Sequence, residues 1–236
     1  MYYGLSRGFF GFDSTILLLI LGMILSLAAS AKLKGTFATY SKVRSMSGLT
    51  GAQTAQRILN AAGIYDVQIV PINGQLTDHY DPRAKEVRLS EASYHQTSLA
   101  AVGVAAHECG HAIQHATGYA PLNVRSAIVP IANIGSTLSW PIFLAGLFLS
   151  MRPLLTAGIV LFSAAVLFQL VTLPVEYNAS SRALRMLDST GILPADELYG
   201  AKKVLGAAAL TYVAALAASV LQLLRLILLA GGRNRD

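Results

Sequence analysis

Long runs of apolar residues alternate with polar stretches along the chain. The first run, residues 14–31, carries no charge, and about 20 apolar residues suffice for a helix to cross a hydrocarbon core of about 30 Å. We therefore predict a first transmembrane helix over residues 12–31. Two runs that lie back to back predict a transmembrane hairpin over residues 129–150 and 153–174, and the last run predicts a fourth transmembrane helix over residues 204–230.

The stretch between the first run and the hairpin, residues 32–125, is polar and long enough for a small domain. Thr50 is a favourable N-cap for a helix over residues 51–64, where apolar side chains recur on one face. Another helix is expected over residues 98–118, which are small and apolar except for a group of ionisable side chains. The small domain should therefore end in a helix that carries chemistry.

Short strands are predicted between these two helices. Residues 66–70 alternate between apolar and polar and stop at Pro71, and residues 86–90 are the most strand-like segment. After the hairpin, Pro174 ends the third apolar run and favours the first turn of a new cytoplasmic helix within residues 175–200. The predicted fold class is a mainly α integral membrane protein with about four transmembrane helices and a small α+β domain.

Composition supports the membrane assignment and suggests an orientation. Hydrophobic residues make up 54% of the 236 residues and charged residues 13%, a balance that water-soluble domains seldom show. Of the 18 Lys and Arg residues, 13 lie in residues 32–125 and 175–203, so the positive-inside rule places both segments in the cytoplasm. The basic residues after the first run also favour a retained anchor over a cleaved signal peptide. For residues 204–230, a helix on the membrane surface is the alternative.

Charge and cysteine content narrow the classes of function. The net charge of +6 is explained by basic residues beside membrane spans, and no basic stripe interleaved with aromatic residues indicates a nucleic-acid partner. Cys109 is the single cysteine, so no disulfide can form within the chain. This agrees with a reducing, cytoplasmic location of the polar domain.

The helix predicted over residues 98–118 contains the sequence His-Glu-Cys-Gly-His at residues 107–111. Because residues four apart share one helix face, His107 and His111 can bind one Zn²⁺ while Glu108 projects beside a water on the metal. A buried glutamate between two histidines is costly in apolar surroundings, and a metal compensates that cost. The spacing predicts a metallopeptidase site in which Glu108 is the general base.

A catalytic zinc ion usually has three protein ligands, so the third should come from elsewhere in the chain. Glu176 is the candidate, because it follows Pro174 at the cytoplasmic membrane boundary, where the zinc-binding helix is also expected. Asp188 is the alternative ligand. We interpret His115 as a neighbour of the site or a surface residue, and Cys109 as a packing residue. The residues expected to surround the ligands are Ser180, Arg182 and Arg185.

Four segments carry these patterns: residues 47–64, 76–90, 98–115 and 175–184. Together, in this order and over nearly the whole chain, they resemble the bacterial YugP-type membrane zinc metallopeptidases. More distantly, the order of anchor, His-Glu-x-x-His, membrane hairpin and Glu-x-x-Ala is similar to membrane proteases of the HtpX and CAAX-processing type. The resemblance implies a zincin-like domain with one Zn²⁺ per chain, held by His107, His111 and Glu176, and Glu108 as the base.

The chain departs from the distant group at two points. That group has an aspartate where this chain has Ser180, and no histidine follows His115, so the group that stabilises the transition state is left open. His79 and Tyr80 lie in a polar turn before residues 86–90. An exposed turn is the ordinary interpretation of this pattern, and a turn that reaches the cleft is the alternative. The candidates for stabilising the oxyanion are Arg182, Tyr177, His79 and Tyr80.

The function expected is that of a multi-pass zinc endopeptidase at the cytoplasmic face of a bacterial plasma membrane. Its polypeptide substrates, membrane proteins among them, would pair along residues 86–90. An intramembrane protease is one alternative, but the nine apolar residues before His107 are too few for a span. A non-catalytic scaffold or sensor is another, in which His115 or Asp188 would be a fourth zinc ligand. A membrane-protein partner or a homo-oligomer is left open.

Overall fold

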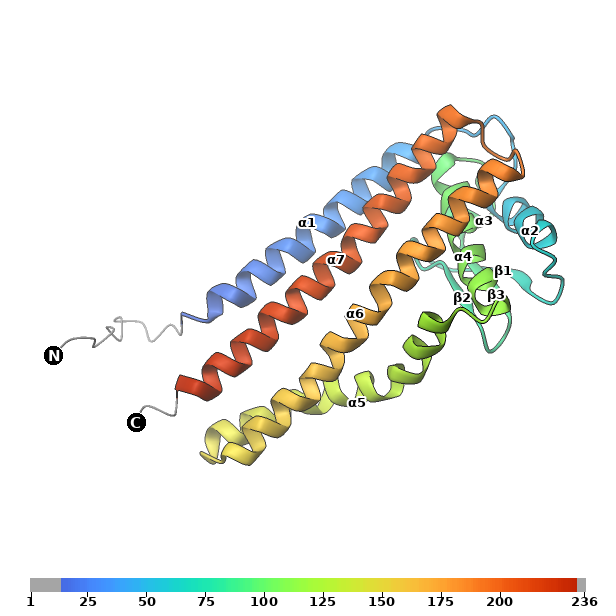
Figure 1. The fold of residues 1–236 in the computed structure, drawn as a ribbon. Coiled ribbons are helices and arrows are strands. Elements are labelled where there is room, and N and C mark those ends of the chain that lie inside the picture. Colours follow the sequence, from blue (N-terminus) through green and yellow to red (C-terminus); the bar gives the residue numbers. More distant parts are fainter. Residues whose placement is uncertain (1–13, 233–236) are drawn as a thin grey trace.

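Four long helices dominate the computed structural model, which describes residues 14–232 (Figure 1). They are α1 (Ile16–Tyr40), α5 (Ala120–Phe148), α6 (Arg152–Ser189) and α7 (Ala195–Gly232). Each is long and apolar enough to cross a membrane. The prediction of a mainly helical chain with four apolar helices is thereby confirmed, although positions 12 and 13 of the first predicted span lie outside the described residues.

The long helices form two antiparallel pairs, with the small domain at one end of the molecule (Figure 1). Helices α5 and α6 form a hairpin, α1 runs beside α7, and α6 also packs on α7. Helix α5 is bent in Figure 1 and contains Pro130 and Pro141, each of which removes a helical hydrogen bond. The start of α1, the end of α7 and the turn between α5 and α6 all lie far from the small domain.

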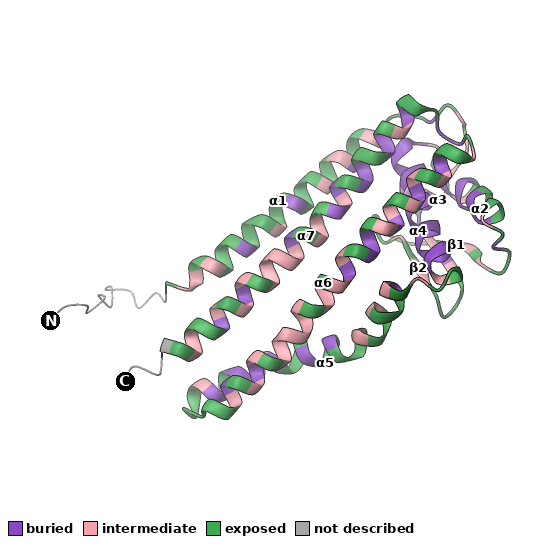
Figure 2. Ribbon diagram, viewed as in Figure 1, coloured by how far each residue is buried: buried purple, intermediate pink, exposed green. Residues whose placement is uncertain are grey.

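The best-buried part of the protein is the small domain rather than the long helices (Figure 2). Helix α4 (Leu99–Ala116) is central and packs against α2 (Gly51–Ala61), α6 and α7. It is buried along most of its length, because its small side chains allow the surrounding elements to approach from several sides. By contrast, the long helices expose many apolar side chains, such as Leu27, which is 67% exposed. Such surfaces are suited to lipid.

Local capping explains where the domain helices begin. The Thr50 hydroxyl accepts a hydrogen bond from the backbone of Gln53, and the Gln53 side chain accepts one from the backbone of Thr50, which completes a capping box. Ser98 caps α4 by accepting from the backbone of Ala101. Gly63, at a φ of 72°, follows the end of α2. Both helices therefore occur where the sequence predicts them.

The sheet contains β1 (Gln68–Ile72), β2 (His79–Asp81) and β3 (Glu86–Ser90), followed by the short helix α3 (Glu91–Tyr94). Strand β3 is central, parallel to β1 and antiparallel to β2. The expectation that a substrate pairs along residues 86–90 is therefore wrong, because neighbouring strands occupy both edges of β3. Pro71 lies inside β1 instead of ending it, which an edge strand tolerates.

Helix α6 runs without interruption through Pro174, so the prediction that a new helix starts there is also wrong. Proline costs helix α6 one backbone hydrogen bond. The turns that follow are compensated by packing, because Val175, Ala179 and Ala183 are completely buried. One continuous helix therefore runs from the apolar region into the small domain, and Glu176 lies on it just after Pro174.

Candidate metal centre

The two histidines of α4 and Glu176 of α6 come together in the interior of the molecule. Nε2 of His107 lies 3.2 Å and Nε2 of His111 lies 3.4 Å from Oε2 of Glu176. All three side chains are buried, and their ligand atoms lie within 4.8 Å of one another. A tetrahedral zinc ion with bonds of about 2.0–2.1 Å separates its ligand atoms by about 3.3–3.4 Å. The donor types and the measured spacings therefore fit zinc.

A hydrogen-bond chain between α4 and α6 fixes the tautomer of His111. The amide nitrogen of Gln114 donates to the backbone oxygen of Val175 and to Oδ1 of Asn178, at 2.8 and 3.0 Å. Its Oε1 atom, 3.1 Å from Nδ1 of His111, is left to accept a hydrogen bond. The proton of a neutral His111 then sits on Nδ1, and the lone pair of Nε2 points to Glu176, as a metal ligand requires.

His107 is oriented in a similar way from α6. Its Nδ1 atom is hydrogen-bonded to Oγ of Ser180 at 3.1 Å, so Ser180 supports a ligand as the sequence suggests. This contact depends on a close approach of the two helices. A Cβ atom on Gly110 would lie 2.4 Å from the backbone oxygen of Ala179. Gly110 therefore permits the crossing that brings Glu176 and Ser180 to the histidines.

Glu108 borders a cavity of about 460 Å³ that reaches the three ligand side chains. Its side chain is buried, and burial raises the pKa of this carboxyl above its ordinary value, while His107 and His111 act in the opposite direction. A carboxylate with a raised pKa accepts a proton more readily near neutral pH. The cavity thus combines three side chains that could hold a metal ion with one basic group beside them.

Two further polar residues in the cavity wall were not singled out by the sequence. Nη1 of Arg125, in α5, lies 3.7 Å from Oε1 of Glu176. Tyr212, in α7, lines the same cavity and interacts electrostatically with the carboxylates of Glu176 and Glu108. No sequence signal distinguishes Tyr212, because Thr211 and Ser219 also carry hydroxyl groups in the same apolar run. Arg125 is hidden among the basic residues near membrane spans.

Among the predicted oxyanion groups, His79 and Tyr80 of β2 line the cavity. The Tyr80 hydroxyl lies 2.8 Å from Nδ1 of His115, which explains why His115 is a neighbour of the site and not part of the ligand cluster. Burial, followed by the charges of Asp66 and Asp81, raises the pKa of Tyr80 to about 12. Tyr80 therefore keeps its proton at neutral pH.

Arg182, Tyr177 and Asp188 do not line this cavity. Nε of Arg182 donates to Oδ1 of Asn178 at 2.8 Å, so Arg182 braces the hydrogen-bond chain behind His111. Tyr177 is 50% exposed. Asp188 is exposed and lies 12 residues beyond Glu176 on the same helix, about 18 Å away along its axis.

Cys109 faces away from the ligand cluster, as the helical spacing predicts. It is completely buried, and its thiol is 3.6 Å from the backbone oxygen of Ala55 in α2, to which it donates. Burial and the neighbouring carboxylate of Glu108 raise the pKa of the thiol. Cys109 is thus a protonated packing residue between α4 and α2.

A second, smaller cavity of about 130 Å³ also borders His107 and Glu108. Its wall is mostly apolar and includes Leu33 and Phe37 of α1 and Val204 of α7. His107 and Glu108 also line the cavity of about 460 Å³, so the candidate metal centre borders both spaces.

Comparisons with known proteins point to the same chemistry. A family model described as "Putative neutral zinc metallopeptidase" matches residues 15–231. The chain is 50% identical over 222 residues to a protein of Bacillus subtilis (strain 168) named "Putative membrane protease YugP", an alignment that covers 94% of this chain and 99% of that protein. No solved structure matches the chain.

Proposed function

Because the chain belongs to the neutral zinc metallopeptidase family, we propose that it is a membrane-anchored endopeptidase whose active centre is His107, His111, Glu176 and Glu108. One observation carries the proposal. Three buried ligand side chains from two helices converge within zinc-binding distances, and Glu108 lies beside them in the wall of a cavity. Three ligands leave one coordination position free, which is the arrangement of catalytic zinc sites.

Bound zinc would supply a Lewis acid that polarises the scissile carbonyl group and acidifies water. Glu108 is the proton carrier: its carboxylate takes a proton from the attacking water and then gives it to the leaving amine. Its burial favours this role, because the raised pKa strengthens it as a base. Ser180 and Gln114 keep the two histidines oriented throughout, since each holds an Nδ1 atom.

We assign stabilisation of the oxyanion to Tyr212, with Arg125 beside it. Both side chains line the larger cavity together with the ligands and Glu108. A hydroxyl or guanidinium donor placed in a partly enclosed cavity stabilises a developing negative charge more strongly than water does. We no longer assign oxyanion stabilisation to Arg182, because its side chain donates a hydrogen bond to Asn178 and does not line the cavity.

The free edge of β2 is the proposed docking site for the substrate backbone. Within residues 14–232, strand β2 pairs with β3 and has no partner strand on its other side. His79 and Tyr80 of β2 line the cavity. An extended peptide that adds to this edge would continue the sheet and pass the metal ligands. Short pairing of this kind selects unfolded or extended segments over folded ones.

The apolar cavity is suited to a substrate side chain next to the cleaved bond. Leu33, Phe37 and Val204 supply an apolar wall close to His107 and Glu108. Burial of an aliphatic or aromatic side chain there contributes about 1.5–3 kcal/mol. We therefore propose a preference for large apolar residues, such as those exposed by damaged or unassembled membrane proteins.

The site is proposed to face the cytoplasm, at the surface of a bacterial plasma membrane. Glu176 follows the third apolar run by two residues, so the ligands lie where α6 emerges from that run. The intramembrane alternative is disfavoured, because α4 is not among the four helices suited to span a membrane. The scaffold alternative is disfavoured as well, because the metal-binding cluster found within residues 14–232 contains three ligands and not four.

The proposal is tested with the full chain purified in detergent and an unstructured protein as substrate. We expect the zinc-loaded wild type to cleave it, and Glu108→Gln to lose at least about 100-fold in rate, since general base catalysis contributes 10²–10⁴-fold. Zinc content is measured alongside, because Glu108→Gln should keep its metal.

Cys109→Ala serves as the matched control, since it changes the next residue on the same helix and should keep both zinc and activity. Cleavage by Glu108→Gln at the wild-type rate would refute the assignment of the base. Full zinc occupancy without cleavage by the wild type, in the presence of membranes and of varied substrates, would favour the scaffold function.

A further inference from the structure

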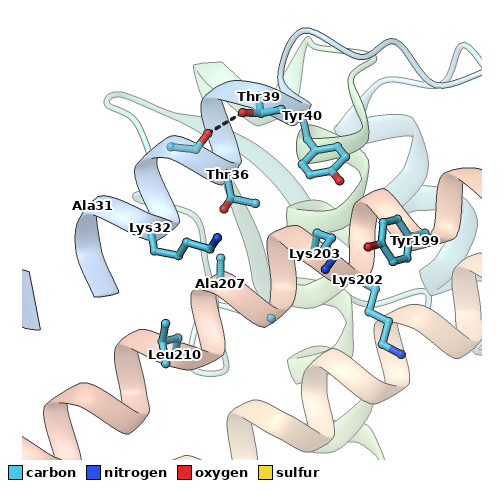
Figure 3. Close-up of a pocket in the computed structure, with 12 residues that line it drawn as sticks. Ala31, Lys32, Thr36, Thr39, Tyr40, Tyr199, Lys202, Lys203, Ala207 and Leu210 are labelled. Carbon is cyan, nitrogen blue, oxygen red and sulfur yellow. Dashed lines mark hydrogen bonds between the residues drawn. The ribbon is translucent and has the colours of Figure 1, made fainter. Parts of the chain in front are cut away.

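A separate cavity of about 920 Å³ lies between α1 and α7, away from the metal ligands (Figure 3). Lys32 extends from α1 and Lys203 from α7 into the space between the two helices (Figure 3). Lys202 of α7 also lines the cavity. Thr36 of α1 adds a hydroxyl group to the wall. Among residues 14–232, no acidic side chain lines the cavity, so the described part of its wall is positively charged.

The lysines of this cavity have no acidic partners. None of Lys32, Lys202 and Lys203 forms an ion pair among residues 14–232, where the lysine that does is Lys85. The amine of Lys203 lies over the ring of Tyr199, 4.9 Å from its centroid. Two or three uncompensated amines near hydroxyl groups form a site for a phosphate-bearing anion.

The position of the cavity along the helices matches a membrane interface. Lys32 directly follows the first apolar run, and Lys202 and Lys203 directly precede the last one. The wall changes from polar to apolar along the helices, ending at Ala31, Ala207 and Leu210. Leu27 lies one helical turn before Ala31 on the same face of α1, is largely exposed, and continues the apolar surface.

We infer that this cavity binds the headgroup of an anionic phospholipid, with its phosphate between Lys32 and Lys203 and its acyl chains along the apolar surfaces of α1 and α7. Basic pockets between transmembrane helices at the cytoplasmic side are known to suit such headgroups. A free phosphate ion would use the lysines but not the apolar end. The combination of both features therefore favours a lipid.

The test measures lipid retention by the full chain in detergent, using native mass spectrometry with added phosphatidylglycerol, phosphatidylcholine or inorganic phosphate. We expect the wild type to bind about one phosphatidylglycerol tightly and phosphatidylcholine weakly. Each lysine near a membrane surface strengthens binding about fivefold, so Lys32→Gln with Lys203→Gln should weaken it about 25-fold. Lys34→Gln is the matched control, because Lys34 lies on α1 but does not line the cavity.

A second variant tests whether lipid binding needs the space of the cavity and not only the charge of its lysines. A side chain at Gly206 enters open space, since a Cβ there meets no atom within 4 Å, so Gly206→Leu should fill the cavity without unfolding the helix. We expect it to reduce lipid binding with all lysines present. Equal phosphatidylglycerol binding by wild type and the double lysine variant, or displacement of the lipid by inorganic phosphate at equal concentration, would overturn the inference.

Discussion

Single side chains decide whether the two histidines can serve one metal ion. Their spacing on α4 is a property of the sequence, but the direction of each Nε2 atom depends on Ser180 and Gln114. The proposed third ligand, Glu176, is buried near both Nε2 atoms and is also approached by Arg125. At this scale the site is a set of mutually oriented groups rather than a motif.

The role of Glu176 leads to a prediction about metal content. Glu176→Gln keeps the size of the side chain but replaces a carboxylate with an amide, a much weaker zinc ligand, so zinc affinity should fall by at least about 100-fold. Zinc retained after dialysis against a graded chelator measures this loss. Asp188→Asn on the same helix should retain zinc as the wild type does, and a loss in that variant instead would make Asp188 the ligand.

The role of Tyr212 leads to a prediction about rate. Tyr212→Phe removes only the hydroxyl group, and loss of one oxyanion donor typically costs about 10²–10³ in kcat. We expect that loss in steady-state cleavage assays, with zinc content and the thermal unfolding temperature unchanged. Tyr177→Phe is the control, because Tyr177 lies outside the cavity. A normal kcat for Tyr212→Phe would leave Arg125, His79 or Tyr80 as the group that stabilises the oxyanion.

Between elements, the contact that matters most for the site is the crossing of α4 and α6. Small residues line it, and Gly110 on α4 meets the backbone of Ala179 on α6 without room for a Cβ atom. The same crossing holds the hydrogen bonds from Gln114 to Val175 and Asn178. Metal geometry is therefore set by how closely two helices approach.

Gly110→Ala should force these helices apart. Overpacking of this kind costs about 1–3 kcal/mol and outweighs the gain of up to about 1 kcal/mol in helix propensity. We expect a lower thermal unfolding temperature and weaker zinc binding, measured on the purified chain. Gly103→Ala on the same helix should be tolerated, because its Cβ would make ordinary contacts with Ala201 at 3.5 Å. Equal behaviour of the two variants would show that the crossing does not limit metal binding.

For the whole molecule, the orientation in the membrane decides which proteins can reach the proposed active centre. The turn between α5 and α6 lies far from the small domain, so the two ends should be on opposite sides of the membrane (Figure 1). The excess of Lys and Arg near the domain predicts that it is cytoplasmic.

Thiol labelling tests this orientation. The two labelling variants are Met151→Cys, in the α5–α6 turn, and Gln75→Cys, in an exposed loop of the small domain. In the unmodified chain Met151 is 45% exposed. In intact spheroplasts an impermeant maleimide should label the first variant only, and after lysis it should label both. The unmodified chain is the control, since Cys109 is buried and protonated. If only Gln75→Cys were labelled in intact spheroplasts, the small domain would lie outside the cytoplasm, opposite to the predicted orientation.

The sequence by itself determined the features that depend on local periodicity and composition. Residue spacing and composition predict the four apolar helices and the capped helix after Thr50. The same holds for the pair His107 and His111, because residues four apart share one face of any α-helix. Glu176 could be proposed because it lies at the same predicted boundary as the histidines. These inferences need no knowledge of which elements touch.

Only the tertiary structure decided what lies beside the candidate centre. Pro174 was expected to start a helix, but burial of the following turns against α4 keeps α6 continuous. Residues 86–90 became a central strand, because β2 folds back on its other side. Tyr212 lies in α7 and Arg125 in α5, and no local pattern encodes a contact that arises when separate helices pack against α4. Long-range packing therefore fixed the cavity, its donors and the free edge of β2.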